Sequence, residues 1–398
     1  MSFVSIRGNR VLNFKKYFFF LVLVVSCNNL YALDKTNLTV EELRISKAEV
    51  SLPLVVNRLS KTLDSFKRSI SDADNLAALR TVVSENAPKL WADARISYQK
   101  ENDFDDRILY WARLQMTKAL RDASSFKDLN SVEQGSLLWQ LELLTRGQQD
   151  INFDSNTKIK ILLTGFDPFF LDRNLDQSNP SGAVALALDG LSLVVHGKSI
   201  EVESLIVPVR FEDFDKGMIE ELLTPYLRDK TIDMLITVSM GRDDFDLERF
   251  PGLRRSAKAP DNLNVFTGAS SDNPLVPSLN GRKLEGPEFV EFSLPASSMK
   301  NMKGDFKIND NHRVTTTEKT FTPIQIDELK TSTSVQGSGG GYLSNEVSYR
   351  SLLLRDAYYP NLPVGHIHTP RFVGFEPKKT EKIIQQIKAM ILLSITDL

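Results

Sequence analysis

An alternation of apolar runs and helix-like segments between residues 158 and 240 constrains the fold of this chain more than any other feature. The first run, Ile159–Phe166 (IKILLTGF), is rich in branched residues and stops at a glycine, as a buried strand does before a functional loop. Such alternation predicts a βαβ sheet covered by helices, with sites at the carboxyl ends of the strands. The later segments are SGAVALALDGL (181–191, helix), SLIVPVRF (204–211, strand), DKGMIEELLTPYLRD (215–229, helix), IDMLITVSM (232–240, strand) and a closing amphipathic helix at 377–395.

The region before this alternation, residues 34–150, has the pattern of helices. Its apolar residues recur at three- and four-residue intervals with few glycines and prolines, as in the segments 52–70 and 106–123. Trp111, Leu114 and Met116 fit this spacing as core residues. We expect a small all-helical domain here, and the polar, turn-rich segment 146–158 is typical of a linker into a second domain over residues 158–398.

The first 33 residues have the layout of a secretory signal peptide. Arg7, Arg10, Lys15 and Lys16 precede the apolar run at 17–25, and no acidic residue occurs before Asp34. The run is shorter than the roughly 20 residues that span a bilayer. We therefore expect a bacterial protein that is exported to the periplasm or anchored to the membrane, with a buried N-terminal helix of a cytosolic protein as the alternative.

Two cleavage patterns compete at the end of this segment. The sequence VVSC (24–27) resembles a lipoprotein box, in which Cys27 would carry a lipid anchor, whereas LYA (30–32) suits an ordinary signal peptidase. Cys27 is the single cysteine of the chain. Intramolecular disulfides and zinc–cysteine clusters are therefore excluded, and the folded body has no cysteine nucleophile.

Charge and loop composition exclude several other function classes. The formal net charge is −2, with no run of like charges, so nucleic acid is not an expected partner. The acidic turn DDFDLE (243–248) lacks the glycine and the ligand spacing of an EF-hand loop. The stretch GSGGGY (337–342) lacks the lysine of a phosphate-binding loop. We expect neither a metal nor an organic cofactor.

Four segments contain the residue types of nucleophilic acyl transfer, in which a histidine takes a hydroxyl proton and a carboxylate orients the histidine. Each residue also has a structural interpretation: a serine in a glycine-rich turn shapes the turn, and His366 and His368 alternate like the polar face of a strand. Composition alone does not bring these residues together. The segments are TGFDPF (164–169), GRDDFDLERF (241–250), GSGGGYLSNEVSY (337–349) and VGHIHTP (364–370).

Six blocks in this order resemble the pyroglutamyl peptidase I (pyrrolidone-carboxylate peptidase) family over about residues 158–398. The resemblance implies a three-layer α/β/α sandwich with a twisted mixed sheet, of the phosphorylase/hydrolase-like type, and it covers none of the helical region. Family members often assemble as homotetramers, so the resemblance implies a homo-oligomer as one possibility; the alternative is that the added helical region blocks or replaces this assembly. The blocks are ILLTGFDPF with NPS (161–181), GR with LER (241–249), APDN (259–262), GPEFVEFSLP (286–295), the glycine-rich stretch (337–349) and GHIHTP (365–370).

The family uses a Glu, Cys, His triad to remove an N-terminal pyroglutamyl residue from peptides. By resemblance, the glutamate is Glu248 and the histidine is His368, and Ser344 occupies the position of the family's cysteine. A serine hydroxyl is not ionised in advance at neutral pH, so His368 would have to remove its proton during attack.

The resemblance also implies substrate-binding residues. Phe166 and Phe169 match the aromatic pair that sandwiches the pyroglutamyl ring, and Asp261 matches an aspartate near the site. Lys258 stands where the family has an arginine, and it lacks the planar fork of donors. The sequence thus predicts an exported peptidase that cleaves a pyroglutamyl or related blocked N-terminal residue. The alternative is an inactive member of the family that acts as a peptide-binding or scaffold protein.

Overall fold

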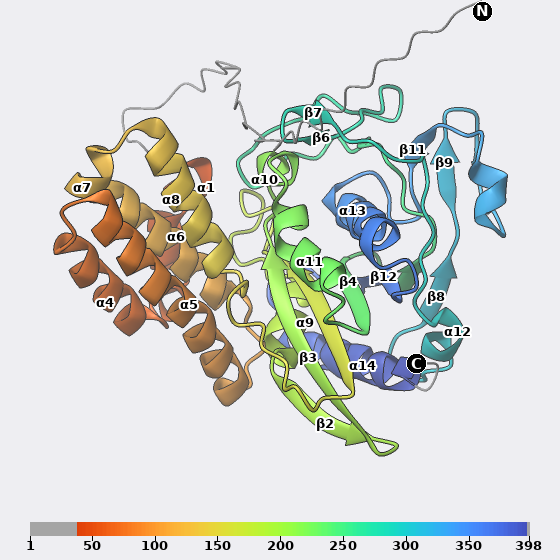
Figure 1. Cartoon of the computed structure of the whole chain (residues 1–398), viewed down its shortest axis with the longest axis horizontal. Coiled ribbons are helices and arrows are strands. Elements are labelled where there is room, and N and C mark those ends of the chain that lie inside the picture. The colour runs from red at the N-terminus through yellow and green to blue at the C-terminus, as the bar shows by residue number, and fades with distance from the viewer. Residues whose placement is uncertain (1–37, 396–398) are drawn as a thin grey trace, which may run out of the picture. The chain divides into compact units, whose positions relative to one another are not determined.

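The computed structural model describes residues 38–395, and its centre is a seven-stranded mixed sheet in the order β2-β3-β1-β4-β12-β5-β8 (Figure 1). Strands β3, β1, β4 and β12 are parallel to one another, while β2 and β5 each pair antiparallel with their neighbours β3 and β12. The predicted mixture of strands and helices is therefore confirmed. The strands are β1 (Ile159–Phe166), β2 (Leu191–Val195), β3 (Lys198–Val207), β4 (Met234–Met240), β5 (Phe245–Glu248), β8 (Ile308–Asn311) and β12 (Val364–Thr369).

The apolar run of β1 is continuous because both faces of the sheet are buried. Ile161 and Leu163 contribute to one hydrophobic core together with residues of α9 and α14, whereas Leu162 contributes to a second core with residues of α11 and α13. Successive side chains of a strand point to opposite faces, so a strand with two buried faces is mostly apolar rather than alternating between apolar and polar residues. The helices that follow β1 are α9 (Pro180–Leu188), α10 (Phe211–Asp215), α11 (Met218–Arg228), α12 (Ala296–Lys300), α13 (Leu343–Tyr358) and α14 (Pro377–Ser394).

The N-terminal part of the described chain is helical, as its periodicity predicts. Asn130 caps α8 by accepting from the N–H groups of Val132 and Glu133, and Asn75 caps α5 in the same way through Ala78. Core residues of these helices belong to the same hydrophobic cluster as Ile161, and the described residues 38–395 lie within one compact unit. The helices are α1 (Val40–Leu43), α2 (Ile45–Ser51), α3 (Pro53–Val56), α4 (Ser60–Ser71), α5 (Leu76–Glu101), α6 (Arg107–Asp122), α7 (Ser124–Lys127) and α8 (Ser131–Leu144).

Short accessory strands fill the segment between β5 and α13, where the sequence analysis predicts none. A three-stranded sheet has the order β10-β9-β11, and β6 pairs with β7. Residues of the three-stranded sheet, such as Thr315 and Thr320, line the cavity described below. The elements are β6 (Ser278–Leu279), β7 (Arg282–Lys283), β9 (Val314–Thr316), β10 (Thr320–Phe321), the 3₁₀ helix η1 (Ile326–Leu329) and β11 (Ser334–Gln336).

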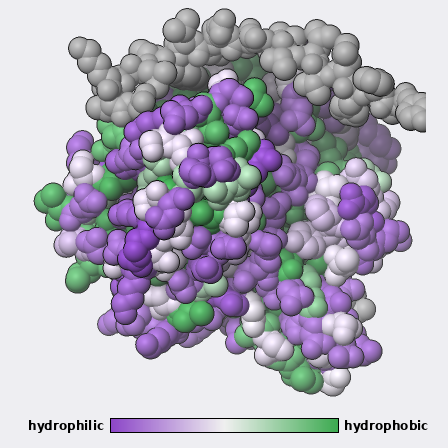
Figure 2. Space-filling model, turned by 60° about the vertical axis from the view of Figure 1, so that its left-hand side comes forward, coloured by the Kyte–Doolittle hydropathy of each residue, from purple (hydrophilic) through white to green (hydrophobic). Residues whose placement is uncertain are grey.

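The predicted signal peptide, with the lipid anchor at Cys27, lies outside the described residues and stays a prediction, as does the homo-oligomer. Over residues 38–395, no helix combines the length and the apolar character needed to cross a membrane. Polar residues dominate the face shown in Figure 2, with apolar residues scattered between them. The exposed apolar residues of the helical region include Val50, Leu54 and Val132.

Candidate active site

The carboxyl ends of β1, β4 and β12 open onto a cavity of about 620 Å³. Glu248, Ser344 and His368 all line this cavity, together with Phe169. Parallel neighbouring strands end at the same edge of a sheet, which is why loops distant in sequence meet here. A smaller cavity of about 40 Å³ adjoins the larger one and shares Phe169, Met240, Tyr342 and Ser344 with it.

Glu248 and His368 form a close pair across the antiparallel strands β5 and β12. His368 Nδ1 lies 2.5 Å from Glu248 Oε1, and Glu248 Oε2 accepts from Asn311 Nδ2 at 2.8 Å. Glu248 is fully buried, and burial raises the pKa of its carboxyl group, while the facing imidazole opposes that rise. With Nδ1 donating to the carboxylate, Nε2 is left as the proton acceptor of a neutral His368.

Ser344 is the second residue of α13, directly after the glycine-rich turn. Its Oγ donates to the carbonyl oxygen of Gly339 in a long hydrogen bond of 3.4 Å. Over residues 38–395 no hydrogen bond joins Ser344 to His368. A Cβ on Gly339 would lie 3.6 Å from His368 Cε1 and 3.5 Å from Asn345 Cα, so Gly339 lies between the imidazole and the first turn of α13.

Two glycines of the turn, Gly337 and Gly341, are required by close packing. A Cβ on Gly337 would lie 2.1 Å from Asn345 Oδ1 and 2.3 Å from the backbone nitrogen of Gly252, and a Cβ on Gly341 would lie 2.0 Å from Ser256 Oγ. Asn345 also holds the turn against Gly252, because its side-chain amide accepts a hydrogen bond from Gly252 N at 2.9 Å and donates one to Gly252 O at 2.7 Å. The turn is thus set by its contacts with the segment that follows Glu248.

Helix α13 begins without a side-chain cap. In the described part of the chain, the backbone N–H groups of Leu343 and Ser344 have no hydrogen-bond acceptor. Free N–H groups and the positive end of the helix dipole favour negative charge at this point. Such a helix end can stabilise an oxyanion that forms beside Ser344.

The two phenylalanines predicted to hold a substrate ring lie at the smaller cavity. Phe166 is buried and stacks on Phe214 with the ring centroids 6.3 Å apart, and Phe169 is half-buried. The structure therefore brings both rings to a cavity that Ser344 also lines. The lining residues are Phe166, Phe169, Asn179, Val209, Ser239, Met240, Tyr342, Leu343 and Ser344.

The structure does not bring the other two predicted substrate-binding residues into either cavity. The Asp261 carboxylate accepts from the backbone N–H groups of Phe211, Leu263 and Val265, so it stabilises a turn. Burial raises the pKa of Asp261, and these hydrogen bonds oppose that rise. The Lys258 side chain is exposed and lines a separate hollow. A role of Lys258 and Asp261 in substrate binding therefore stays a prediction from the sequence match.

Sequence reasoning missed residues that support the predicted triad. Asn311 contacts Glu248 from β8, and no signal in its polar surroundings singles it out. His366 is fully buried, with Nδ1 2.8 Å from Thr237 Oγ1 and Nε2 2.7 Å from Ser239 Oγ. Burial lowers the pKa of His366 well below its usual range, so this histidine stays neutral and fills the strand interface. Both histidines lie in β12, all of whose residues are buried.

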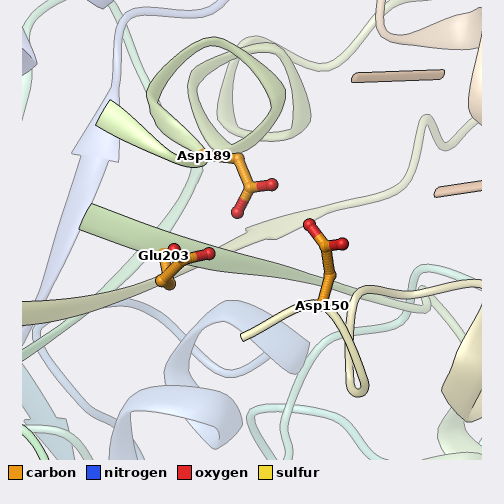
Figure 3. A group of neighbouring side chains, drawn as sticks. All are labelled: Asp150, Asp189 and Glu203. Atoms are coloured by element: carbon orange, nitrogen blue, oxygen red, sulfur yellow. The ribbon is translucent and has the colours of Figure 1, made fainter. Parts of the chain in front are cut away.

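One group in the described chain has the composition of a cation site. Carboxylate oxygens of Asp150, Asp189 and Glu203 lie within 4.8 Å of one another (Figure 3), away from the two cavities. Asp189 is already engaged, because it accepts from Trp91 Nε1 and from the backbone N–H of Ser204. The Arg95 guanidinium lies 3.5 Å from Asp189 and 3.9 Å from Asp150, so it supplies positive charge to the group.

Comparison with known proteins identifies relatives of both regions. A model described as the PA0049 N-terminal domain matches residues 27–142, and the model of the PA0049 C-terminal domain matches residues 160–289 and 298–373. The uncharacterized protein PA0049 of Pseudomonas aeruginosa is 29% identical over 350 residues, covering 67% of this chain and 63% of the relative. This chain therefore matches less than two thirds of the length of that relative.

Among solved structures, a mutant pyrrolidone carboxyl peptidase from Pyrococcus furiosus is 23% identical with a TM-score of 0.41, over 60% of this chain and 100% of that one. The structure titled as the Pyrococcus furiosus peptidase and its cysteine-free mutant gives 23% identity and a TM-score of 0.42, over 60% and 99%. The C-terminal model matches more than half of the chain, and the chain therefore belongs to the PA0049 family.

Proposed function

We propose that this protein is a serine peptidase or amidohydrolase that cleaves a pyroglutamyl or related blocked residue from the N-terminus of a peptide. The observation that carries the proposal is the buried Glu248–His368 pair at a cavity that also contains Ser344 at an uncapped helix end. A nucleophile, a base, an orienting carboxylate and oxyanion donors are the components of acyl transfer. The resemblance of the sequence blocks supports the pyroglutamyl substrate class.

In the proposed reaction, Ser344 Oγ attacks the carbonyl carbon of the amide while His368 Nε2 accepts the hydroxyl proton. The N–H groups of Leu343 and Ser344 stabilise the oxyanion. His368 then gives its proton to the leaving amine as the C–N bond breaks, which leaves an acyl-serine. Water attacks this ester, again losing its proton to His368, and the proton returns to Ser344 as the acid is released. Glu248 holds the imidazole in its orientation and stabilises its charged form.

Attack needs Ser344 to turn away from Gly339. Its present hydrogen bond of 3.4 Å to the Gly339 carbonyl is long, so little is lost when the hydroxyl rotates toward the imidazole. Catalytic hydrogen bonds are often loose without substrate and tighten in the complex.

The experiment measures hydrolysis of pyroglutamyl-7-amido-4-methylcoumarin by the purified protein. Ser344→Ala should lower kcat/KM by about a thousandfold or more, because it removes the attacking atom. Ser348→Ala is the matched control: it lies one turn further along α13, is buried, and its hydroxyl has no hydrogen-bond partner within the described residues. The control should stay within about twofold of the wild type. Equal activity of the wild type and Ser344→Ala would overturn the serine mechanism.

The alternative is a binding protein that holds peptide N-termini in the same cavities without cleaving them. The missing hydrogen bond between Ser344 and His368 favours it. Absence of turnover by the wild type, with activity in Ser344→Cys, would mean that the site is intact and the serine inactive. If neither the wild type nor Ser344→Cys turns over the substrate, but calorimetry shows that the wild type binds a pyroglutamyl peptide, the result would support the alternative of a binding protein.

A further inference from the structure

Residues 167–179, here called the pocket loop, join β1 to α9 and carry Phe169, one of the residues of the smaller cavity. The loop is bound at four places by side chains from the helical region. Arg44 pairs with Asp172, Arg107 with Asp176, and Asp106 with the loop's last two residues. The fourth place, Asp167, lies between the two phenylalanines in sequence.

Asp167 receives one guanidinium on each carboxylate oxygen. Arg146 Nη1 donates to Oδ2 at 2.8 Å, and Arg113 Nη2 donates to Oδ1. All three side chains are at most 3% exposed. Arg113 comes from α6 and Arg146 from the turn after α8, so both donors belong to the helical region. Charges buried this deeply are held in one geometry, because a displaced partner would leave an uncompensated charge.

The far end of the loop is fixed from the same side. Asp106 accepts from Ser178 Oγ at 2.5 Å and from the backbone N–H of Asn179 at 3.0 Å. The Asn179 side chain then donates to the carbonyl oxygen of Asp167 at 2.8 Å, which ties the two ends of the loop together. Asn179 also lines the smaller cavity.

We infer that the helical region is a positioning element for the smaller cavity, and that Arg113 and Arg146 are positioning residues that hold Phe166 and Phe169 through Asp167. The inference rests on the proposed function, since it concerns the binding of the blocked residue. The contacts of Arg113 and Arg146 with Asp167 are here called the clamp. Weakening the clamp should impair binding of the substrate in the ground state and in the transition state alike, because it displaces the pocket wall and leaves Ser344 and His368 in place. Loss of such uniform binding raises KM with little change in kcat.

The test compares Asp167→Asn with Gln99→Leu in the full chain. Gln99 also joins the helical region to the α/β region, through the carbonyl oxygens of Leu186 and Asp189, but it does not touch the pocket loop. Asp167→Asn should raise KM for the pyroglutamyl coumarin amide about tenfold, with kcat within threefold. Hydrogen exchange of peptides covering 167–179 should quicken by about tenfold while β1 stays protected. Gln99→Leu should change neither readout.

Unchanged KM and unchanged exchange in folded Asp167→Asn would overturn the inference, and so would equal effects of Gln99→Leu, which would indicate a merely structural junction. If Asp167→Asn does not fold, Arg113→Lys provides the test, because it keeps the positive charge. It should raise KM and quicken the hydrogen exchange of residues 167–179 by about threefold each. If the wild type hydrolyses no pyroglutamyl substrate, the proposed function fails separately. In that case, the hydrogen exchange of residues 167–179 in Asp167→Asn still tests whether the clamp holds the pocket loop.

Discussion

The two walls of the candidate site are held in different ways. The pocket loop is held by ionic contacts from the helical region, including two guanidinium groups on Asp167. The glycine turn, residues 337–342, is held by close approach of its backbone to neighbouring atoms and by the paired hydrogen bonds of Asn345 to Gly252. The stability of the pocket loop should therefore depend on charge and pH, and that of the glycine turn on side-chain volume. A single cavity can thus combine two independent kinds of stabilisation.

The largest effect on stability should come from Gly337→Ala, because the glycine turn has no space for the added methyl group. The added Cβ would lie 2.3 Å from the Gly252 backbone nitrogen, which cannot move aside like a flexible side chain. We expect a loss of about 2 to 3 kcal/mol in the free energy of unfolding, measured by urea denaturation. Gly135→Ala is the control, because that exposed glycine in α8 has nothing within 4 Å of its added Cβ and should gain about 0.5 to 1 kcal/mol. Equal stability of the two variants would contradict the close packing.

A smaller effect concerns the pH dependence of stability that His366 in β12 causes. The pKa of His366 is well below its unfolded value of 6.5, so below pH 6.5 the unfolded chain takes up a proton that the folded protein refuses. Stability should therefore fall as pH falls, by at most about 1.4 kcal/mol per pH unit for this one group. His366→Asn should flatten that part of the profile between pH 6.5 and 5, whatever its effect on absolute stability. Parallel denaturation profiles of variant and wild type would show that His366 is not the responsible group.

The smallest effect should come from Asp172→Asn, at an exposed position in the middle of the pocket loop. The Arg44 guanidinium, with Nη2 2.7 Å from Asp172 Oδ2, lowers the pKa of Asp172 from 3.8 to about 2. The stabilisation from a lowered pKa is complete above the unfolded value of 3.8 and is lost as pH falls toward 2. Because the Asp172 side chain is 51% exposed, we expect less than about 1 kcal/mol. Thermal melts from pH 5 to 2 should show the variant approaching the wild type, and a gap that stays constant would exclude this ion pair as its cause.

Much of the fold follows from periodicity. The strands β1 and β4 and the helices α9 and α11 lie where the apolar patterns predict them. The sequence analysis predicts no strand at β2, an edge strand whose residues alternate between half-buried and exposed although four of its five residues are apolar. The accessory strands have two to three residues each in polar surroundings and depend on tertiary contacts.

The candidate site was predictable only where motifs supply its residues. Glu248, Ser344 and His368 come from sequence blocks, and the structure places all three at one cavity. The ionic contacts that hold the pocket loop join pairs such as Arg113 with Asp167, which are 54 residues apart, and Arg44 with Asp172, which are 128 apart. Single-sequence patterns contain no information on which distant charges meet. Lys258 and Asp261 also come from sequence matches, and within the described residues they line neither of the two cavities.

Under the proposed function, the difference in size between the two cavities has a consequence for which peptide bonds can be cleaved. The smaller one, about 40 Å³, has room for roughly three water molecules, whereas the larger one has about 620 Å³. A compact ring could occupy the first while the rest of a peptide extends through the second. A peptide bond in the middle of a chain would require the smaller cavity to accept a continuing backbone, for which it has no room. Selection for a chain end would then be a matter of shape, independent of any charge that recognises a terminus.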